Sequence, residues 1–271
     1  MPLISRSQRV IATALCGALY GATGYITSSI PSPLGPLGQF RPAIIVPVIF
    51  AVFFGPWVAG VGAAIGSQIT DMLTSGYFLS GLIAGMPGNF AGFYLYGWLL
   101  RGKFSWRRYV LTSVFTLFFA NLFTAALVDV YYVLFLPSLF KSLSWGIALA
   151  IGLGAYWFIT MLPFALTIDP ALIRVLCRTR PDLAPAEVLS AALKDETREV
   201  AMALILTGAL ICAIGIVFLI TPEVVLFADI PAHPLQLLFG GGGLIMIALG
   251  IGFLLANRLK RRSASGRPQP E

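Results

Sequence analysis

Apolar residues run in long stretches along this chain, separated by short polar and basic segments. Six stretches are long enough to cross a bilayer as helices, because the hydrocarbon core is about 30 Å thick and a helix rises about 1.5 Å per residue. They cover residues 10–30, 81–100, 109–136, 145–168, 200–220 and 235–256. A further stretch, residues 42–73, is too long for one span and barely long enough for two.

The placement of the basic residues decides between one span and two, because Lys and Arg accumulate in cytoplasmic loops. A turn at Gly55-Pro56-Trp57 gives spans over residues 42–54 and 58–73, eight in all, with both termini on one side. All but two of the 18 Lys and Arg residues are then cytoplasmic, the exceptions being Arg41 and Lys141. We therefore predict an all-α, multi-pass protein of the cell membrane with both termini cytoplasmic. A cleaved signal peptide is disfavoured, since no small-x-small site follows the first stretch.

Polar segments divide the chain into four predicted parts. Residues 1–169 form a six-helix bundle that closes at Asp169-Pro170, where the proline favours a helix end. Residues 170–198 form a cytoplasmic linker or surface helix, and residues 199–257 hold two additional transmembrane helices. Residues 258–271 form a basic tail that we expect to be disordered.

Composition supports this assignment, with 58% hydrophobic and only 11% charged residues. Such values exclude a soluble enzyme, a disordered chain and a nucleic-acid-binding module. The net charge of +7 follows from the topology and needs no nucleic-acid partner. The three cysteines are too far apart for a disulfide framework, and the single histidine, His233 in a predicted outer loop, cannot form a metal cluster. No catalytic motif or cofactor signature occurs, so we predict neither an enzyme nor a cofactor or metal site.

Small residues line the first predicted helix at spacings of three and four. They are Ala14, Gly17, Ala18, Gly21 and Ala22. Small faces let helices approach closely in lipid, where packing drives association. Two interpretations stay open, internal packing within the bundle and a docking face for another membrane protein.

Polar residues inside the spans are costly and are candidates for function. The predicted site lies in the outer half of the bundle, beneath the Pro- and Gly-rich loop of residues 27–41, a candidate lid. Its polar members are Arg41, Gln68, Asp71, Asn89 and Asp129, and its aromatic members are Tyr131, Tyr132, Tyr156 and Trp157. Asp71 and Asp129 have two open interpretations, as ligand contacts and as structural partners of Arg41. Asn121 and Thr160 are better explained by hydrogen bonds between helices.

Several motifs resemble the substrate-binding S component of energy-coupling factor (ECF) vitamin transporters. They are Gly38-Gln39-Phe40-Arg41-Pro42, Val46-Pro47, the run from Phe54 to Gly60, Ala63-Ala64-Ile65-Gly66 and Asp71. The alanines Ala14, Ala18 and Ala22 are similar to the first-helix motif through which this family docks on its T subunit. The resemblance covers residues 9–169, and the two C-terminal helices depart from the family's six-helix plan.

The resemblance implies a binder for a small organic micronutrient, working with a membrane T subunit and two cytoplasmic ATPases. Met1-Pro2-Leu3 lacks the histidine of the metal-transporting branch, so a flavin, pterin, pyrimidine or queuosine precursor is expected. In the family the substrate lies beneath the loop between the first two helices, which agrees with the polar residues above. The alternatives are a secondary transporter or channel that works without ATP, a small integral-membrane enzyme and a purely structural subunit.

Overall fold

The computed structural model describes residues 5–29, 39–74, 76, 78–192, 197–220 and 232–265, which are almost entirely helical and contain no strand. The first helix, α1 (Arg6–Ser28), starts with a capping box. The Ser5 hydroxyl accepts the Gln8 amide at 3.2 Å, and the Gln8 side chain accepts the Ser5 amide at 2.7 Å. These reciprocal bonds use two of the amides that a helix start leaves without partners.

The predicted break within residues 42–73 is confirmed. A short turn, η2 (Pro42–Ile44), leads into α2 (Ile45–Phe54), and α3 (Pro56–Thr74) follows directly. Gly55 between them has a φ of 87°, which a side chain would disfavour, and Pro56 begins α3 without needing an amide partner. The Gly55-Pro56 pair therefore ends one helix and starts the next.

The predicted helix over residues 81–100 is divided in the structure. A single turn, α4 (Phe78–Ser80), passes into the π-helical turn η3 (Gly81–Gly85) and then α5 (Met86–Leu100). Pro87 lacks the amide that would continue a regular helix across this point. The wider turn brings glycine backbone against α3, because a Cβ at Gly85 would lie 2.7 Å from Asp71 Oδ2.

Helix α6 (Trp106–Phe135) is followed by the long helix α7 (Leu143–Thr179). The prediction of a helix end at Asp169-Pro170 is wrong, because α7 continues past both Pro163 and Pro170. Prolines are tolerated within such helices where neighbouring groups satisfy the freed carbonyls. The carbonyls that Pro163 and Pro170 leave without a helical amide are those of Ile159 and Leu166, and in the turns beside them Tyr109 donates to the Ala165 carbonyl at 2.6 Å and Thr167 to the Pro163 carbonyl at 2.6 Å. The division of the chain at residue 169 therefore does not coincide with a helix end.

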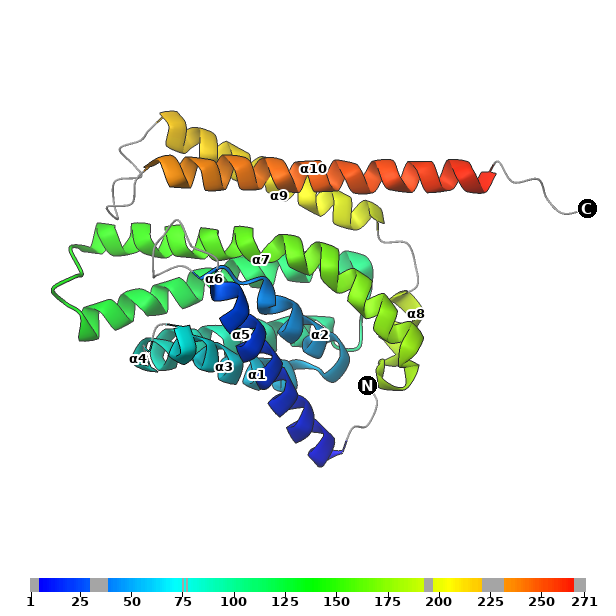
Figure 1. Cartoon of the computed structure of the whole chain (residues 1–271), viewed down its shortest axis with the longest axis horizontal. Coiled ribbons are helices and arrows are strands. Elements are labelled where there is room, and N and C mark those ends of the chain that lie inside the picture. The colour runs from blue at the N-terminus through cyan, green and yellow to red at the C-terminus, as the bar shows by residue number, and fades with distance from the viewer. Residues whose placement is uncertain are drawn as a thin grey trace, which may run out of the picture.

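The segment predicted as a linker contains the end of α7, the turn η4 (Pro181–Leu183) and the short helix α8 (Ala186–Ala192). Helices α9 (Thr197–Ile220) and α10 (Ala232–Ser265) then form a hairpin beside α7 (Figure 1). Because α10 begins at Ala232, His233 belongs to its first turn and not to a loop.

The predicted disordered tail is also corrected, since α10 extends through residue 265. Basic residues near a helix C-terminus interact favourably with the negative end of the helix dipole, which is consistent with this extension. Residues 266–271 of that tail, and residues 30–38 of the predicted lid, lie outside the described residues.

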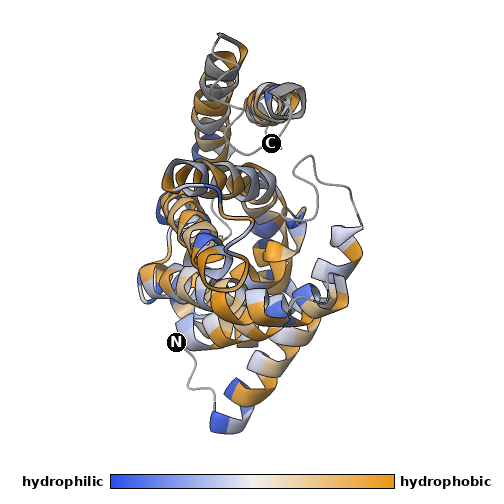
Figure 2. Ribbon diagram, turned by 90° about the vertical axis from the view of Figure 1, so that its left-hand side faces the viewer, coloured by the Kyte–Doolittle hydropathy of each residue, from blue (hydrophilic) through white to orange (hydrophobic). Residues whose placement is uncertain are grey.

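Within the described residues, four helices are long and apolar enough to span a membrane, namely α1, α6, α7 and residues Phe239–Leu259 of α10. Large hydrophobic side chains cover much of the outer surface, and the orange of hydrophobic residues recurs along most of the helices in Figure 2. Such a surface suits lipid and would be a liability in water. The chain is thus a multi-pass membrane protein.

Helices α1 and α3 pack with close backbone approach. A Cβ at Gly21 would lie 2.8 Å from the Ile69 side chain, and one at Gly66 would lie 2.8 Å from the Gly17 carbonyl. Only glycine permits this spacing without displacement of a neighbour. The glycine face of α1 is therefore internal, whereas Ala14, Ala18 and Ala22 lie exposed on its other side.

Candidate functional site

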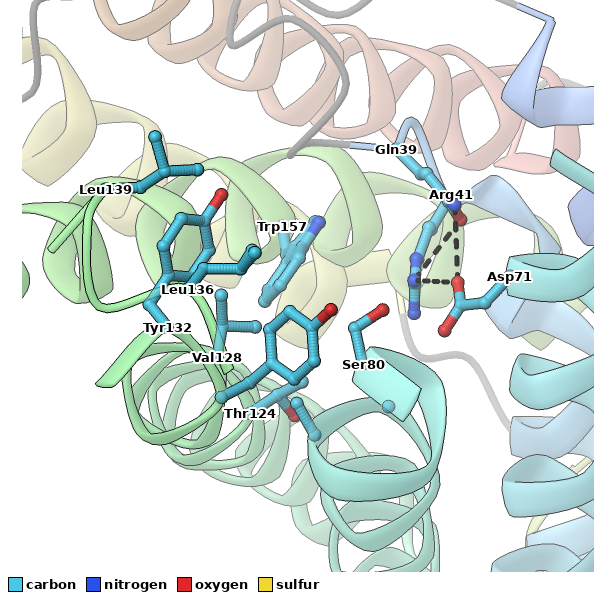
Figure 3. Close-up of a pocket in the computed structure, with 13 residues that line it drawn as sticks. Gln39, Arg41, Asp71, Ser80, Thr124, Val128, Tyr132, Leu136, Leu139 and Trp157 are labelled. Atoms are coloured by element: carbon cyan, nitrogen blue, oxygen red, sulfur yellow. Dashed lines mark hydrogen bonds and ion pairs between the residues drawn. The ribbon is translucent and has the colours of Figure 1, made fainter. Parts of the chain in front are cut away.

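A cavity of about 380 Å³ lies between the end of the Pro- and Gly-rich loop, α3, the π-helical turn η3, α6 and α7 (Figure 3). This volume falls within the range of small-molecule sites. Its lining combines a charged end with aromatic and aliphatic walls. The lining residues are Gln39, Arg41, Asp71, Ser80, Ala84, Gly85, Thr124, Val128, Tyr131, Tyr132, Leu136, Leu139 and Trp157.

An ion pair forms the charged end of the cavity. Arg41 Nη2 lies 3.3 Å from Asp71 Oδ1, and both side chains are about one-tenth exposed. Gln39 joins them, because its amide donates to Asp71 Oδ1 at 3.3 Å and its carbonyl oxygen accepts from Arg41 at 3.2 Å. Asp71 and Asp129 were the two candidate partners of Arg41, and in the structure Arg41 pairs with Asp71. The paired charges offset each other, so this end of the cavity is polar without a net charge.

Aromatic rings form the wall beside this pair. The Arg41 guanidinium lies 5.5 Å from the centre of the Trp157 ring, within cation–π range. Tyr131 and Tyr132, one turn from the end of α6, complete the wall. Figure 3 shows Trp157 between Tyr132 and Arg41. The cavity can therefore hold a planar ring against aromatic faces while polar groups contact its edge.

Two buried donors at this site have no hydrogen-bond partner among the described residues. They are Arg41 Nε and Trp157 Nε1. A buried donor without a partner is costly, and a ligand acceptor would remove that cost. Both donors belong to cavity-lining residues, so the site is prepared for a ligand that carries hydrogen-bond acceptors.

Five of the nine predicted substrate-binding residues line this cavity: Arg41, Asp71, Tyr131, Tyr132 and Trp157. The other four do not. Tyr156 lies in the core and is 2% exposed. Neighbouring residues on a helix point in different directions, so Tyr156 does not face the cavity that Trp157 lines. Gln68 donates to the Phe78 carbonyl at 3.1 Å.

Asn89 and Asp129 also lie away from the lining. Asn89 bridges helices, accepting from the Tyr20 hydroxyl at 3.0 Å and donating to the Gly85 carbonyl at 2.8 Å. Asp129 faces the first turn of α7, where a Cβ at Gly146 would lie 3.4 Å from its Oδ2. Its Oδ1 has no partner among the described residues. Asp129 is thus near the cavity without bordering it.

Sequence reasoning missed several lining residues. Thr124 lies seven positions before Tyr131 and Val128 lies four positions before Tyr132, a helical spacing that places them on the same face and could have identified them. Ser80, Ala84 and Gly85 reach the cavity through the π-helical turn, for which the apolar pattern gave no signal. Asp169, read as part of a helix end, is instead fully buried inside α7.

The helical membrane fold and the aromatic cavity define a membrane protein with a site suited to a small organic ligand. A family described as "ECF-type riboflavin transporter, S component" matches residues 5–166, more than half of the chain. The chain therefore belongs to this family of transporter subunits, and the resemblance seen in the sequence is confirmed. Comparisons with curated proteins and with solved structures returned no match. The family match ends within α7, so α9 and α10 lie outside it.

Proposed function

We propose that this chain is the substrate-binding subunit of an ATP-driven ECF importer and that its substrate is riboflavin or a closely related flavin. The observation that carries the proposal is the cavity in which Tyr131, Tyr132 and Trp157 adjoin the Arg41–Asp71 pair. A flavin is a flat, three-ring molecule with carbonyl oxygens on one edge and a hydroxylated chain. Aromatic walls suit its ring faces. The unused N–H groups of Arg41 and Trp157 suit its acceptor edge.

The charge of the cavity favours an uncharged ligand. Asp71 offsets the charge of Arg41, and Gln39 bridges the two. An anionic ligand would have to compete with Asp71 for the guanidinium, and the displaced carboxylate would stay buried at a cost. Riboflavin, which is neutral, avoids this competition.

The membrane topology is part of the proposal, with six helical spans in the family region, two more in α9 and α10, and both termini cytoplasmic. The placement of basic residues supports it. The C-terminal end of α10 also lies at the same end of the bundle as α8 (Figure 1). Cysteine labelling tests it, with Lys103→Cys and Ser138→Cys in a chain whose native cysteines are replaced by alanine. We expect cytoplasmic labelling at 103 and external labelling at 138. Labelling of both from one side would contradict the topology.

The proposed partners are a T-type membrane subunit, which docks on Ala14, Ala18 and Ala22, and two cytoplasmic ATPases. The exposure of these alanines beside the internal glycine face supports the docking role. It argues against the alternative in which the alanines serve internal packing. A secondary transporter would need an intramembrane carboxylate that is free for ion coupling at its substrate site, and Asp71, the carboxylate that lines the cavity, is engaged by Arg41 and Gln39.

Titration of riboflavin against the purified full-length chain tests the proposal, with the quenching of flavin fluorescence as the readout. We expect saturable binding with one flavin per chain. Mass spectrometry of small molecules that co-purify with the chain provides the second arm. If riboflavin fails to bind while a different compound co-purifies at equal stoichiometry, the flavin assignment is wrong.

A further inference from the structure

A buried chain of hydrogen bonds links α1 to the wall of the cavity. The Tyr20 hydroxyl on α1 donates to Asn89 Oδ1 on α5 at 3.0 Å, and Asn89 Nδ2 donates to the Gly85 carbonyl at 2.8 Å. Tyr20 is 2% and Asn89 7% exposed. Gly85 ends the π-helical turn η3 and lines the cavity. Two residues outside the cavity are thus tied to part of its wall.

The same turn rests on the charged end of the cavity from its other side. A Cβ at Gly85 would lie 2.7 Å from Asp71 Oδ2, and one at Gly81 would lie 3.2 Å from it. Oδ1 of the same carboxylate accepts from Arg41 and Gln39. The turn is therefore held between the Arg41–Asp71 pair and the Tyr20–Asn89 bridge.

The local backbone alone fixes this turn weakly. π-helical turns are rare, appear mostly as single turns inside α-helices, and occur frequently at functional sites. Pro87, two residues after it, supplies no amide. Side-chain bonds such as that from Asn89 to the Gly85 carbonyl consequently have a large share in deciding where the turn lies.

We propose that Tyr20 and Asn89 are positioning residues of the ligand site, which set the place of the η3 wall relative to α1 and so couple α1 to the occupancy of the cavity. Neither residue lines the cavity. The proposal rests on the proposed function only for the identity of the ligand used as a probe. Since coupling between two sites is reciprocal, a ligand that fixes the wall also stabilises the α1 contact.

Tyr20→Phe in the full-length chain is the test, because it removes one hydroxyl and keeps the ring packed. Tyr96→Phe is the matched control. Tyr96 is also fully buried, lies on α5 and bridges helices through its hydroxyl, 2.6 Å from Ser113 Oγ, but it does not line the ligand cavity. Both changes remove one buried interhelical hydrogen bond and should lower thermal stability to a similar extent.

We expect Tyr20→Phe to weaken riboflavin binding about three- to tenfold, as loss of one hydrogen bond predicts, and Tyr96→Phe to leave it within about twofold. Hydrogen exchange gives a readout that a purely structural bond would not move. Peptides over residues 78–90 of the ligand-free chain should exchange faster in Tyr20→Phe than in Tyr96→Phe. Riboflavin should slow exchange over residues 16–24 in the wild type and lose that effect in Tyr20→Phe.

Equal affinities and equal exchange over residues 78–90 in the two variants would overturn the coupling and leave Tyr20 as a packing residue. Failure of the proposed function looks different, because the wild type itself would then not bind riboflavin. In that case the exchange comparison in the ligand-free chain still decides the positioning role.

Discussion

The N-terminal bundle and the α9–α10 hairpin are held together by different kinds of contact. The bundle buries an ion pair, an interhelical Tyr20–Asn89 bond and a polar stripe along α6. The hairpin relies on close backbone approach, since a Cβ at Gly208 would lie 2.7 Å from the Gly243 carbonyl. Among its described residues, Thr207 is the buried polar side chain. Costly buried polar groups indicate function in a membrane protein, whereas small-residue contacts indicate association. The difference favours the bundle as the place of the proposed ligand site and a packing role for the hairpin.

The position of the hairpin extends this contrast. It packs beside α6 and α7, where a Cβ at Gly242 would lie 3.1 Å from the Ile159 side chain. Helix α1 packs on α3 and α2 instead. The two additional helices therefore leave the exposed alanine face of α1 uncovered, and the departure from the six-helix plan need not prevent docking of a T subunit there.

The largest expected effect is at the charged end of the cavity. Arg41→Ala removes a donor from a desolvated site and leaves Asp71 without its cation, a loss that typically amounts to about 2–5 kcal/mol. We expect riboflavin affinity to fall about 30-fold to several thousandfold, measured by fluorescence titration. Arg41→Lys keeps the charge for Asp71 but loses the Nε–H and the planar stacking, so it should fall between Arg41→Ala and wild type. If Arg41→Ala bound riboflavin with wild-type affinity, the ligand site would not lie in this cavity of the bundle.

The second effect concerns uptake alone. Replacing Ala14 and Ala18 with Leu should block close approach of a partner helix and reduce riboflavin uptake by cells at least about tenfold. Binding to the purified chain should stay within about twofold, since these residues lie outside the cavity. Val10→Leu, at an exposed position of the same helix, serves as the control and should transport normally. A joint loss of binding and uptake in the double variant would contradict a docking role.

Much of this fold could be predicted from the sequence because apolar length and Gly-Pro signals act locally. The break at Gly55-Pro56 is an example, and the sequence also singled out Arg41 and Asp71 as site residues, although it left the partner of Arg41 open between Asp71 and Asp129. The direction in which each polar side chain points depends on structural features that leave no local signal in the sequence. The π-helical turn precedes Asn89, which bonds to Tyr20, and α7 continues past Pro170. The presence of a helix was therefore easier to predict than its rotation about its own axis. That rotation decides which residues face the cavity.

A smaller effect tests the hairpin. At Gly243 a Cβ would lie 2.6 Å from Cys212 Sγ, so Gly243→Leu overpacks the α9–α10 contact and should cost about 1–3 kcal/mol of stability. Thermal unfolding in detergent measures this loss. Gly252→Leu on the same helix enters open space and should unfold like wild type. Riboflavin affinity should stay within about twofold in both. A large binding defect in Gly243→Leu would mean that the hairpin contributes to the site.

The smallest effect is expected at Asp129, and it tests how sharply the site is bounded. The sequence suggested this carboxylate as a ligand contact, but it faces Gly146 while its neighbours Val128, Tyr131 and Tyr132 line the cavity. Asp129→Asn preserves the shape of the side chain and leaves that lining in place. We therefore expect riboflavin affinity within about threefold of wild type by the same titration. A loss of tenfold or more would show that the cavity extends to the start of α7 when a ligand is bound, and it would restore Asp129 to the site beside Arg41.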